Sequence, residues 1–186
     1  MDRIIKKTHP KLADKAIGYI QDSLAELPWM DHIFGRAERL VSEVDGKRIK
    51  LPNVYIGRDE YEQVTPDAQE LGNHAFFLLN DPQTITLVHG SRAVTKSPYS
   101  LIIWVDVRTI DEHDERNTEG IKSQVLAQLN NTWMKQGSFT IERIYEKAEN
   151  VYEGFTLDEI DNQYLMSPFW GMRITGVLTI EDDCAS

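Results

Sequence analysis

The clearest hydrophobic pattern lies near the N-terminus and is helical. From about residue 10 to residue 27, apolar side chains recur at every fourth position with further apolar residues beside them, which is the spacing of an amphipathic helix. Pro10 suits the first turn of such a helix, and Pro28 ends it. The expected buried stripe consists of Leu12, Ala13, Ala16, Ile17, Ile20 and Leu24.

The pattern then changes to the two-residue alternation of β-strands. Apolar and polar residues alternate over 40–44 and again over 49–51, on either side of Asp45-Gly46, a dipeptide that favours a two-residue hairpin turn. The second strand runs on to Ile56, with Pro52 at a bulge or a sheet edge. The stretch Pro52–Asp67 carries two tyrosines, and it fits a join between two strands better than a binding loop.

Three further strands are expected in the middle of the chain. Two short apolar segments, 74–80 and 83–89, flank the turn signal Asn80-Asp81-Pro82. Residues 99–110 alternate most strictly, and both faces of this segment are apolar. Because such a strand needs cover on both sides, we predict that it is central in the sheet. One face holds Leu101, Ile103, Val105 and Val107, and the other holds Ile102 and Trp104.

The C-terminal half predicts a second helix, two strands and a short third helix. The second helix begins near Asn117 or Thr118, and Gly137 closes that unit. A strand over 138–152 and a short capped helix that ends at Pro168 come next, followed by a last strand to about residue 181. The residues behind these predictions are Ile121, Val125 and Leu129 for the helix stripe, Thr156 and Glu159 for the capping box, Met172, Ile174, Leu178 and Ile180 for the apolar face of the last strand, and Arg173, Thr175 and Thr179 for its polar face.

This order of elements predicts an α+β fold with a mainly antiparallel sheet and helices packed on one of its faces. Most strands follow one another through short turns, which favours antiparallel pairing. The 186 residues fit a single domain, with an N-terminal helix at about 10–27 and a sheet with inserted helices at about 37–181.

Composition and charge narrow the functional classes. Apolar residues make up 41% of the chain and charged residues 27%, an ordinary globular balance. The net charge is −10, but residues 1–50 carry a net of +2 and residues 51–186 a net of −12. A chain of this kind is not expected to grip DNA, although it could border DNA and repel it. An acidic surface that serves solubility is the simpler interpretation.

Other sequence features favour a soluble protein of a reducing compartment. The single cysteine, Cys184, excludes an intrachain disulfide. The first residues lack the apolar core of a signal peptide, and the longest apolar run is about five residues, far below the ~20 that a membrane-spanning helix needs.

Catalytic motifs are missing from the sequence. It holds no nucleotide-binding or phosphate-binding glycine motif, no HExxH, no paired CxxC and no GxSxG. Its five histidines are scattered without ligand spacing, so we expect no metal and no cofactor. Two weak candidates remain for a hard cation: a nuclease-like set of Asp31, Asp45 and Lys47, and the charged loop Asp111–Glu115 around His113. A hairpin turn explains the first better, and a solvated charge cluster explains the second.

The aromatic residues are more ambiguous. Trp29, Trp104, Trp133 and Trp170 could form a stacking platform, but their apolar neighbours favour packing in the core or at an interface. The segment 166–172, MSPFWGM, gathers Met and aromatic residues around Pro168. It suits a subunit contact as well as it suits a core.

Taken together, these segments resemble the small neck and tail proteins of tailed bacteriophages. The resemblance is carried by the hairpin and the join PNVYIGRDEY, by LGNHAFFLLNDPQ and LIIWVDVR, and by the closing YEGFTLDEIDNQYLMSPFWGMRITGVLTI. Within that class the chain resembles the tail-terminator (tail-completion) group, as found in phages of gut Bacteroidetes (crAss-like phages). The likeness lies in element order and texture over most of the chain, and no functional residue of the group can be transferred to it.

The resemblance implies a non-enzymatic virion protein that forms a homo-oligomeric ring at the neck or tail. Its partners would be neighbouring neck, portal or tail proteins, and DNA would pass nearby without specific binding. The alternative from a different class is an intracellular metal-dependent hydrolase or nuclease that uses Asp31, Asp45 and Lys47, or the 111–115 cluster.

Overall fold

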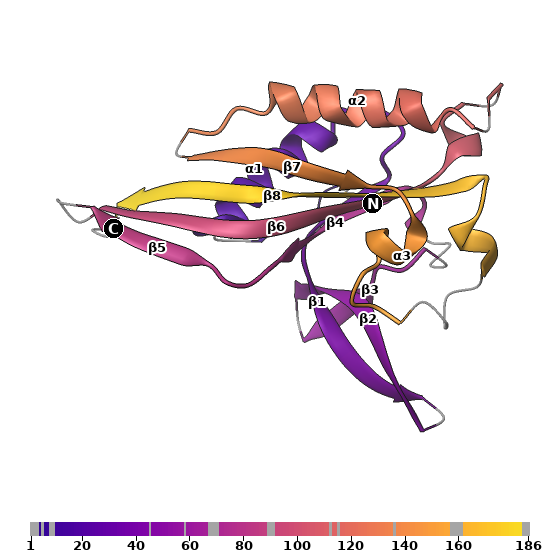
Figure 1. The fold of residues 1–186 in the computed structure, drawn as a ribbon, viewed down its shortest axis with the longest axis horizontal. Coiled ribbons are helices and arrows are strands. Elements are labelled where there is room, and N and C mark those ends of the chain that lie inside the picture. The colour runs from indigo at the N-terminus through magenta and orange to yellow at the C-terminus, as the bar shows by residue number, and fades with distance from the viewer. Residues whose placement is uncertain are drawn as a thin grey trace.

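The fold is built around one long sheet, and it is described here from a computed structural model (Figure 1). The structure describes residues 4, 6–7, 10–44, 46–57, 59–66, 71–88, 92–111, 113–114, 116–135, 137–156 and 162–183. Within these residues the elements are α1 (Ala13–Leu24), β1 (His32–Val44), β2 (Lys47–Gly57), β3 (Glu60–Gln63), β4 (His74–Leu79), β5 (Thr84–Val88), β6 (Arg92–Asp106), η2 (Val107–Thr109), α2 (Thr118–Asn131), β7 (Gly137–Tyr145), α3 (Ala148–Val151), η4 (Asn162–Leu165) and β8 (Phe169–Asp183).

The sheet order is β3-β2-β1-β4-β6-β8-β7, and β5 pairs with β6 beside β4. All neighbouring strands are antiparallel except β1 and β4, which run parallel. The sheet is therefore mixed but mostly antiparallel, and the predicted α+β class is confirmed. β6 lies between β4 and β8 and is central, as its two apolar faces predicted.

The first hydrophobic core lies between the sheet and the two long helices. The helix stripes expected from the sequence are buried there, and they face alternate side chains of β6 and β8. One prediction was wrong. Leu12 has φ 50°, precedes the first helical residue and is 38% exposed. This core includes Ala16, Ile17, Ile20, Leu24, Leu101, Ile103, Val105, Val107, Ile121, Val125, Leu129, Met172, Ile174, Leu178 and Ile180.

A second core covers the opposite face of the sheet, where helices were not expected. Ile102 and Trp104 of β6 pack there against Val151 and Tyr152, at the end of α3, and against the η4 turn. Arg173 was placed on the polar face of the last strand, and it lies on this face of β8, but it is buried there, and burial lowers its pKa. The Arg173 guanidinium donates to Ser100 Oγ, the Asn150 carbonyl and the Glu153 carboxylate, and it thereby ties α3 to the sheet.

Several boundaries differ from the sequence pattern. β1 begins at His32, well before the 40–44 alternation, because Ile33 and Phe34 each enter one of the two cores. The hairpin with β2 is confirmed, with Val44 opposite Lys47 and Gly46 at φ 75°. Pro52 lies where the β2–β3 pairing ends, since the paired residues begin at Asn53 and the Pro52 carbonyl accepts from the Val64 N–H.

Two short elements, β3 and α3, lie in segments for which the sequence pattern predicted a join and a strand. The 52–67 join contains β3, and the strand expected over 138–152 stops at Tyr145 before α3. Thr156, the expected helix cap, instead accepts a hydrogen bond from the Lys50 backbone N–H, while Glu159 lies outside the described residues. Before Pro168 the described residues form the η4 turn.

Candidate interaction surfaces

The nuclease-like residues are held apart in the structure. Asp31 precedes β1, and its carboxylate accepts a hydrogen bond from the Asn73 backbone N–H at 2.9 Å. Lys47 follows the far end of β1, whose 13 residues span about 40 Å at ~3.3 Å per residue. Asp45 lies outside the described residues. Asp31 and Lys47 therefore cannot act on one metal ion or one substrate within a subunit.

The 111–115 loop uses its first carboxylate to fold the loop. Asp111 accepts hydrogen bonds from Asn117 Nδ2 and from the backbone N–H groups of His113 and Asp114, at 3.0–3.1 Å. These bonds lower the pKa of Asp111, and the bond from Asn117 has the largest effect. Asn117 in turn caps α2 by accepting from the Gly120 N–H. Glu112 and Glu115 are not among the described residues. In the part of the chain that is described, no group of three or more His, Cys, Asp or Glu is placed to hold a metal ion.

Asn73, a polar residue that the sequence did not single out, organises the end of the sheet at which β4 begins. The buried Asn73 amide donates to the Trp29 carbonyl and to Thr109 Oγ1, and its oxygen accepts from the Asp106 N–H, all at 2.8–2.9 Å. A lone asparagine between a glycine and a histidine resembles many loop residues, so nothing in the sequence distinguished it. Asn73 fixes three separated segments, and its role is structural.

A cleft of about 730 Å³ opens beside this network, and residues 166–169 of the MSPFWGM segment line it. Trp104 stacks on Phe169 at 5.2 Å between ring centroids, and the Arg108 guanidinium also lies over the Phe169 ring. His74 stacks on Trp104 from within the core, where burial lowers its pKa to about 4. Met166, at the rim, is 64% exposed. The aromatic cluster is thus mainly core packing with an exposed edge.

The four tryptophans divide in the same way. Trp29 and Trp104 are buried, and Trp29 Nε1 donates to Gln124 Oε1, which joins the segment after α1 to α2. Trp170 packs against the first core. Trp133, which follows α2, is 73% exposed. Core packing therefore explains three of them, and Trp133 needs a separate explanation.

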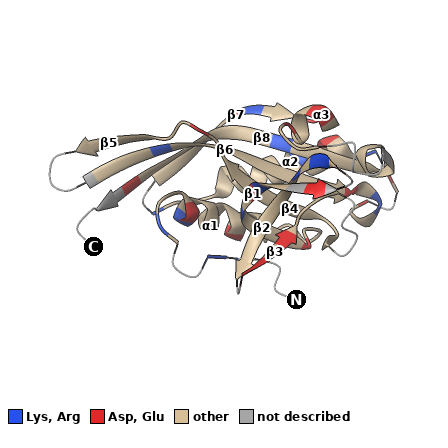
Figure 2. Ribbon diagram, turned by 90° about the horizontal axis from the view of Figure 1, so that it is seen from below, with Lys and Arg blue, Asp and Glu red and all other residues tan. Residues whose placement is uncertain are grey.

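β5 is the least covered strand of the sheet. All five of its residues are exposed, and Ile85 and Leu87 reach 65% and 80% exposure. Within the described residues β5 pairs with β6 alone, so its other edge keeps free N–H and C=O groups. Figure 2 shows that β5 carries no charge and projects beyond the helices at one end of the molecule. Monomeric proteins usually protect such edges with charges, prolines or a covering segment.

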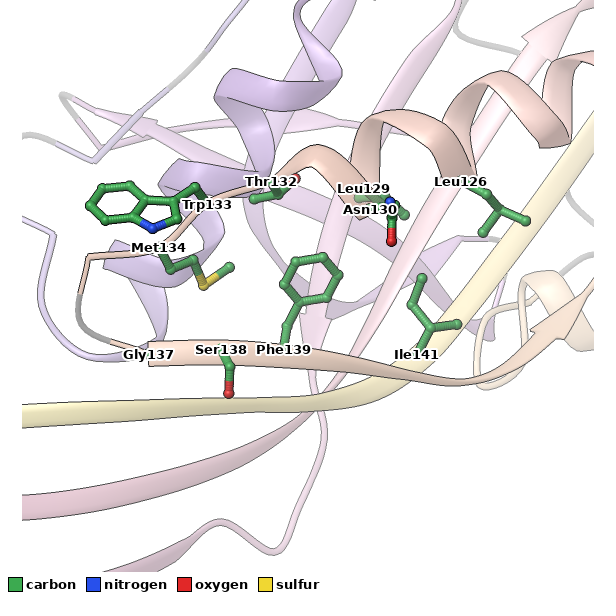
Figure 3. Close-up of a pocket in the computed structure, with 10 residues that line it drawn as sticks. All are labelled: Leu126, Leu129, Asn130, Thr132, Trp133, Met134, Gly137, Ser138, Phe139 and Ile141. Atoms are coloured by element: carbon green, nitrogen blue, oxygen red, sulfur yellow. The ribbon is translucent and has the colours of Figure 1, made fainter.

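A second uncovered surface lies on the opposite side of the β6–β8 pair, beside β7. A groove of about 760 Å³ runs between the end of α2 and β7, as Figure 3 shows. Phe139 and Ile141 point from β7 toward α2, and Trp133 and Met134 stand at the end of the groove. Its described lining is uncharged and consists of Leu126, Leu129, Asn130, Thr132, Trp133, Met134, Gly137, Ser138, Phe139 and Ile141.

The charged residues are spread over the fold rather than concentrated on one described element. In Figure 2, Lys or Arg and Asp or Glu both occur along the helices and strands. Several are paired, as in Lys122 with Glu119 and Glu146, and Lys7 with Asp14. The charge difference between the two parts of the sequence thus gives no simple division of the described surface.

Comparisons with known proteins add no relative. No protein-family model matches the sequence, and no curated protein matches it. Among the described residues, no helix is both long and apolar enough to cross a membrane.

Proposed function

We propose that this protein is a non-enzymatic structural component of a tailed phage that assembles into a closed homo-oligomeric ring at the neck or tail. The observation that carries this proposal is β5, an uncharged edge strand with every residue exposed. Ile85 and Leu87 give it an apolar face, and among the described residues its backbone is unpaired on one side, so a partner that covers it gains both burial and hydrogen bonds.

The position of the second uncovered surface supports a ring rather than a simple pair. β5 and the β7 groove lie on opposite sides of the β6–β8 pair, and their shapes differ. A contact between two unlike surfaces repeats from copy to copy, and it closes into a ring when the rotation per copy divides a full turn.

The phage setting rests on the resemblance of the sequence segments and on charge. An α+β sheet flanked by helices agrees with what that resemblance implies for neck and tail proteins. The net charge of −10 suits a wall past which DNA moves without sticking. Its partners are further copies of itself and the neighbouring neck, portal or tail proteins, and its location is the virion assembled in the host cytoplasm.

The hydrolase alternative is less well supported by the described geometry. Asp31 and Lys47 are separated by the length of β1, and Asp111 is occupied in its own loop. A catalytic role would need a cluster of carboxylates that converge in one cleft.

The decisive experiment is cryo-electron microscopy of the assembled phage particle, with mass photometry of the purified protein beside it. We expect a ring of copies in the particle and, in solution, masses that are multiples of 21.4 kDa. A particle that holds the chain as a single copy, or lacks it, overturns the proposal. A ring whose inner wall is lined by Lys and Arg overturns the charge argument alone.

A further inference from the structure

We propose that the ring contact is a continuation of the sheet, in which β5 of one copy pairs antiparallel with the free edge of β7 of the next copy. Ile85 and Leu87 of the first copy then enter the groove beside Trp133 of the second. This inference rests on the proposed self-association and assigns its two mating surfaces.

The first support comes from the faces on which the side chains lie. Ile85 is opposite Thr95, Thr95 is opposite Ile180, and Ile180 is opposite Gly137, so one row of residues crosses four strands. Residues directly opposite one another lie on the same face of a sheet. By the two-residue period, Leu87 shares the face of Ile85.

The same rule places the groove on that face. Phe139 and Ile141 follow Gly137 at two-residue steps, and Phe139 is opposite the buried Leu178 of the first core. Both side chains therefore point to the face that α1 and α2 cover. If a second copy continues the sheet without turning it over, its Ile85 and Leu87 arrive on the face where the groove opens.

The second support comes from strand direction. β5 is antiparallel to β6, β6 to β8 and β8 to β7, so β5 runs opposite to β7. A copy added in the same orientation therefore presents its β5 antiparallel to the β7 edge. In the described sheet both strands have one unpaired edge, and these edges lie on opposite sides. Each copy can thus pair through its β5 edge with one neighbour and through its β7 edge with another.

The third support is the match in polarity. β5 has the sequence TITLV, without a charge, and the described lining of the groove is also uncharged, in a chain of which 27% is charged. Burial of both surfaces therefore desolvates no charged side chain among these residues. The exposed indole of Trp133 would be covered by the incoming strand, which explains why it lies outside the core.

A complementation experiment tests the contact. Leu87→Lys disables β5, and Ile141→Lys disables the groove; both sites are exposed, so each variant should fold like the parent by circular dichroism. Val41→Lys on the β1–β2 hairpin, at a residue 56% exposed, is the matched control. We expect the parent and the control to form rings at some concentration below about 1 mM, the dissociation constant of a weak association. Sedimentation and mass photometry detect these rings. Each disabled variant alone should remain monomeric.

Mixing the two disabled variants gives the sharpest result. One junction stays competent, between β5 of the Ile141→Lys protein and the groove of the Leu87→Lys protein. The mixture should therefore form a dimer of one copy each and go no further. Tryptophan emission should shift to shorter wavelength on assembly of the parent, and this shift should be absent in Trp133→Phe.

Other outcomes separate this inference from the proposed function. If Leu87→Lys blocks assembly while Ile141→Lys assembles normally, β5 pairs with itself and the proposed contact is wrong. If both variants assemble like the parent, the ring uses other surfaces; the inference fails and the ring stands. A parent that is monomeric at every concentration also overturns the contact, and the virion image then decides the proposed function by itself.

Discussion

β4 and β5 are neighbours in sequence, are both apolar and pair with the same side of the same strand, yet their surroundings are opposite. β4 lies antiparallel to β6 opposite Tyr99–Trp104, and β5 lies antiparallel to β6 opposite Arg92–Lys96. The first five residues of β4 are buried, whereas every residue of β5 is exposed. The two strands thus follow one another along a single edge of β6.

The difference lies in what covers each strand. Ala75 and Phe77 of β4 enter the first core, and Phe76 and Leu78 enter the second, so β4 is packed on both faces. β5 lies beyond the ends of α1 and α2 at the end of the molecule (Figures 1 and 2). β4 is therefore part of the core of the subunit, whereas β5 is exposed at its surface.

A buried charge at the centre of the sheet should have the largest effect. Val105 is fully buried in β6 opposite Trp170, so Val105→Asp leaves an unpaired carboxylate in the core. We expect a loss of about 5 kcal/mol or more, enough to unfold a domain of ordinary stability. Thermal melts by circular dichroism measure this, and Val88→Asp on the exposed β5 is the matched control that should stay folded. A Val105→Asp protein that melts like the parent would show that the core is misassigned.

Truncation of one side chain in each strand tests the comparison directly. Phe77→Ala in β4 should cost about 3–5 kcal/mol in the free energy of unfolding, because it leaves a cavity in the first core. Leu87→Ala in β5 should change that free energy of the monomer by less than about 0.5 kcal/mol. Urea unfolding of the monomeric protein gives both values, and equal losses would contradict the different cover of the two strands.

His74, at the start of β4, should make stability depend on pH. Its pKa is about 4 in the folded protein against 6.5 unfolded, because burial penalises the charged ring. The unfolded chain therefore binds a proton at higher pH than the native state does. His74 therefore does not lower the free energy of unfolding above pH 6.5. That free energy falls as the pH decreases from 6.5 toward 4, by at most about 3 kcal/mol.

Urea unfolding of the parent and of His74→Gln at a series of pH values between 7 and 5 checks this. The variant should lose less stability over that range, whereas His113→Gln, at an exposed residue, should behave like the parent. Parallel curves for the parent and His74→Gln would rule out a contribution from His74.

The smallest expected effect is that of metal ions. Asp31 and Asp106 both line the cleft next to β4, but Asp31 accepts from the Asn73 N–H and Asp106 forms a two-point ion pair with Arg108. Melting temperatures with excess magnesium, manganese or zinc, or with EDTA, should coincide, since a ligand of the native state would raise them. A clear rise in the melting temperature with a metal ion would favour the hydrolase hypothesis.

The sequence alone determined the elements whose pattern is local. The stripe of α1, the strict alternation of β6, the Asp45-Gly46 hairpin and the Asn117 start of α2 all follow from spacing and from turn or cap chemistry. The hairpin turn already argued against a site built from Asp45 and Lys47, but the length of β1 that separates Asp31 from Lys47 was seen only in the structure. Neither Asn73 nor the buried Arg173 could be recognised in this way, because their partners come from distant segments.

Only the tertiary structure decided which apolar strand is covered. Alternation states which side chains share a face, but it does not state which element reaches that face. HAFFLL and TITLV therefore both predicted ordinary strands, and the groove beside β7 had no signal of its own. The positions at which α1, α2 and α3 cross the sheet are set by contacts far apart in the chain. Those contacts bury β4, leave β5 exposed and leave Trp133 at the mouth of the groove.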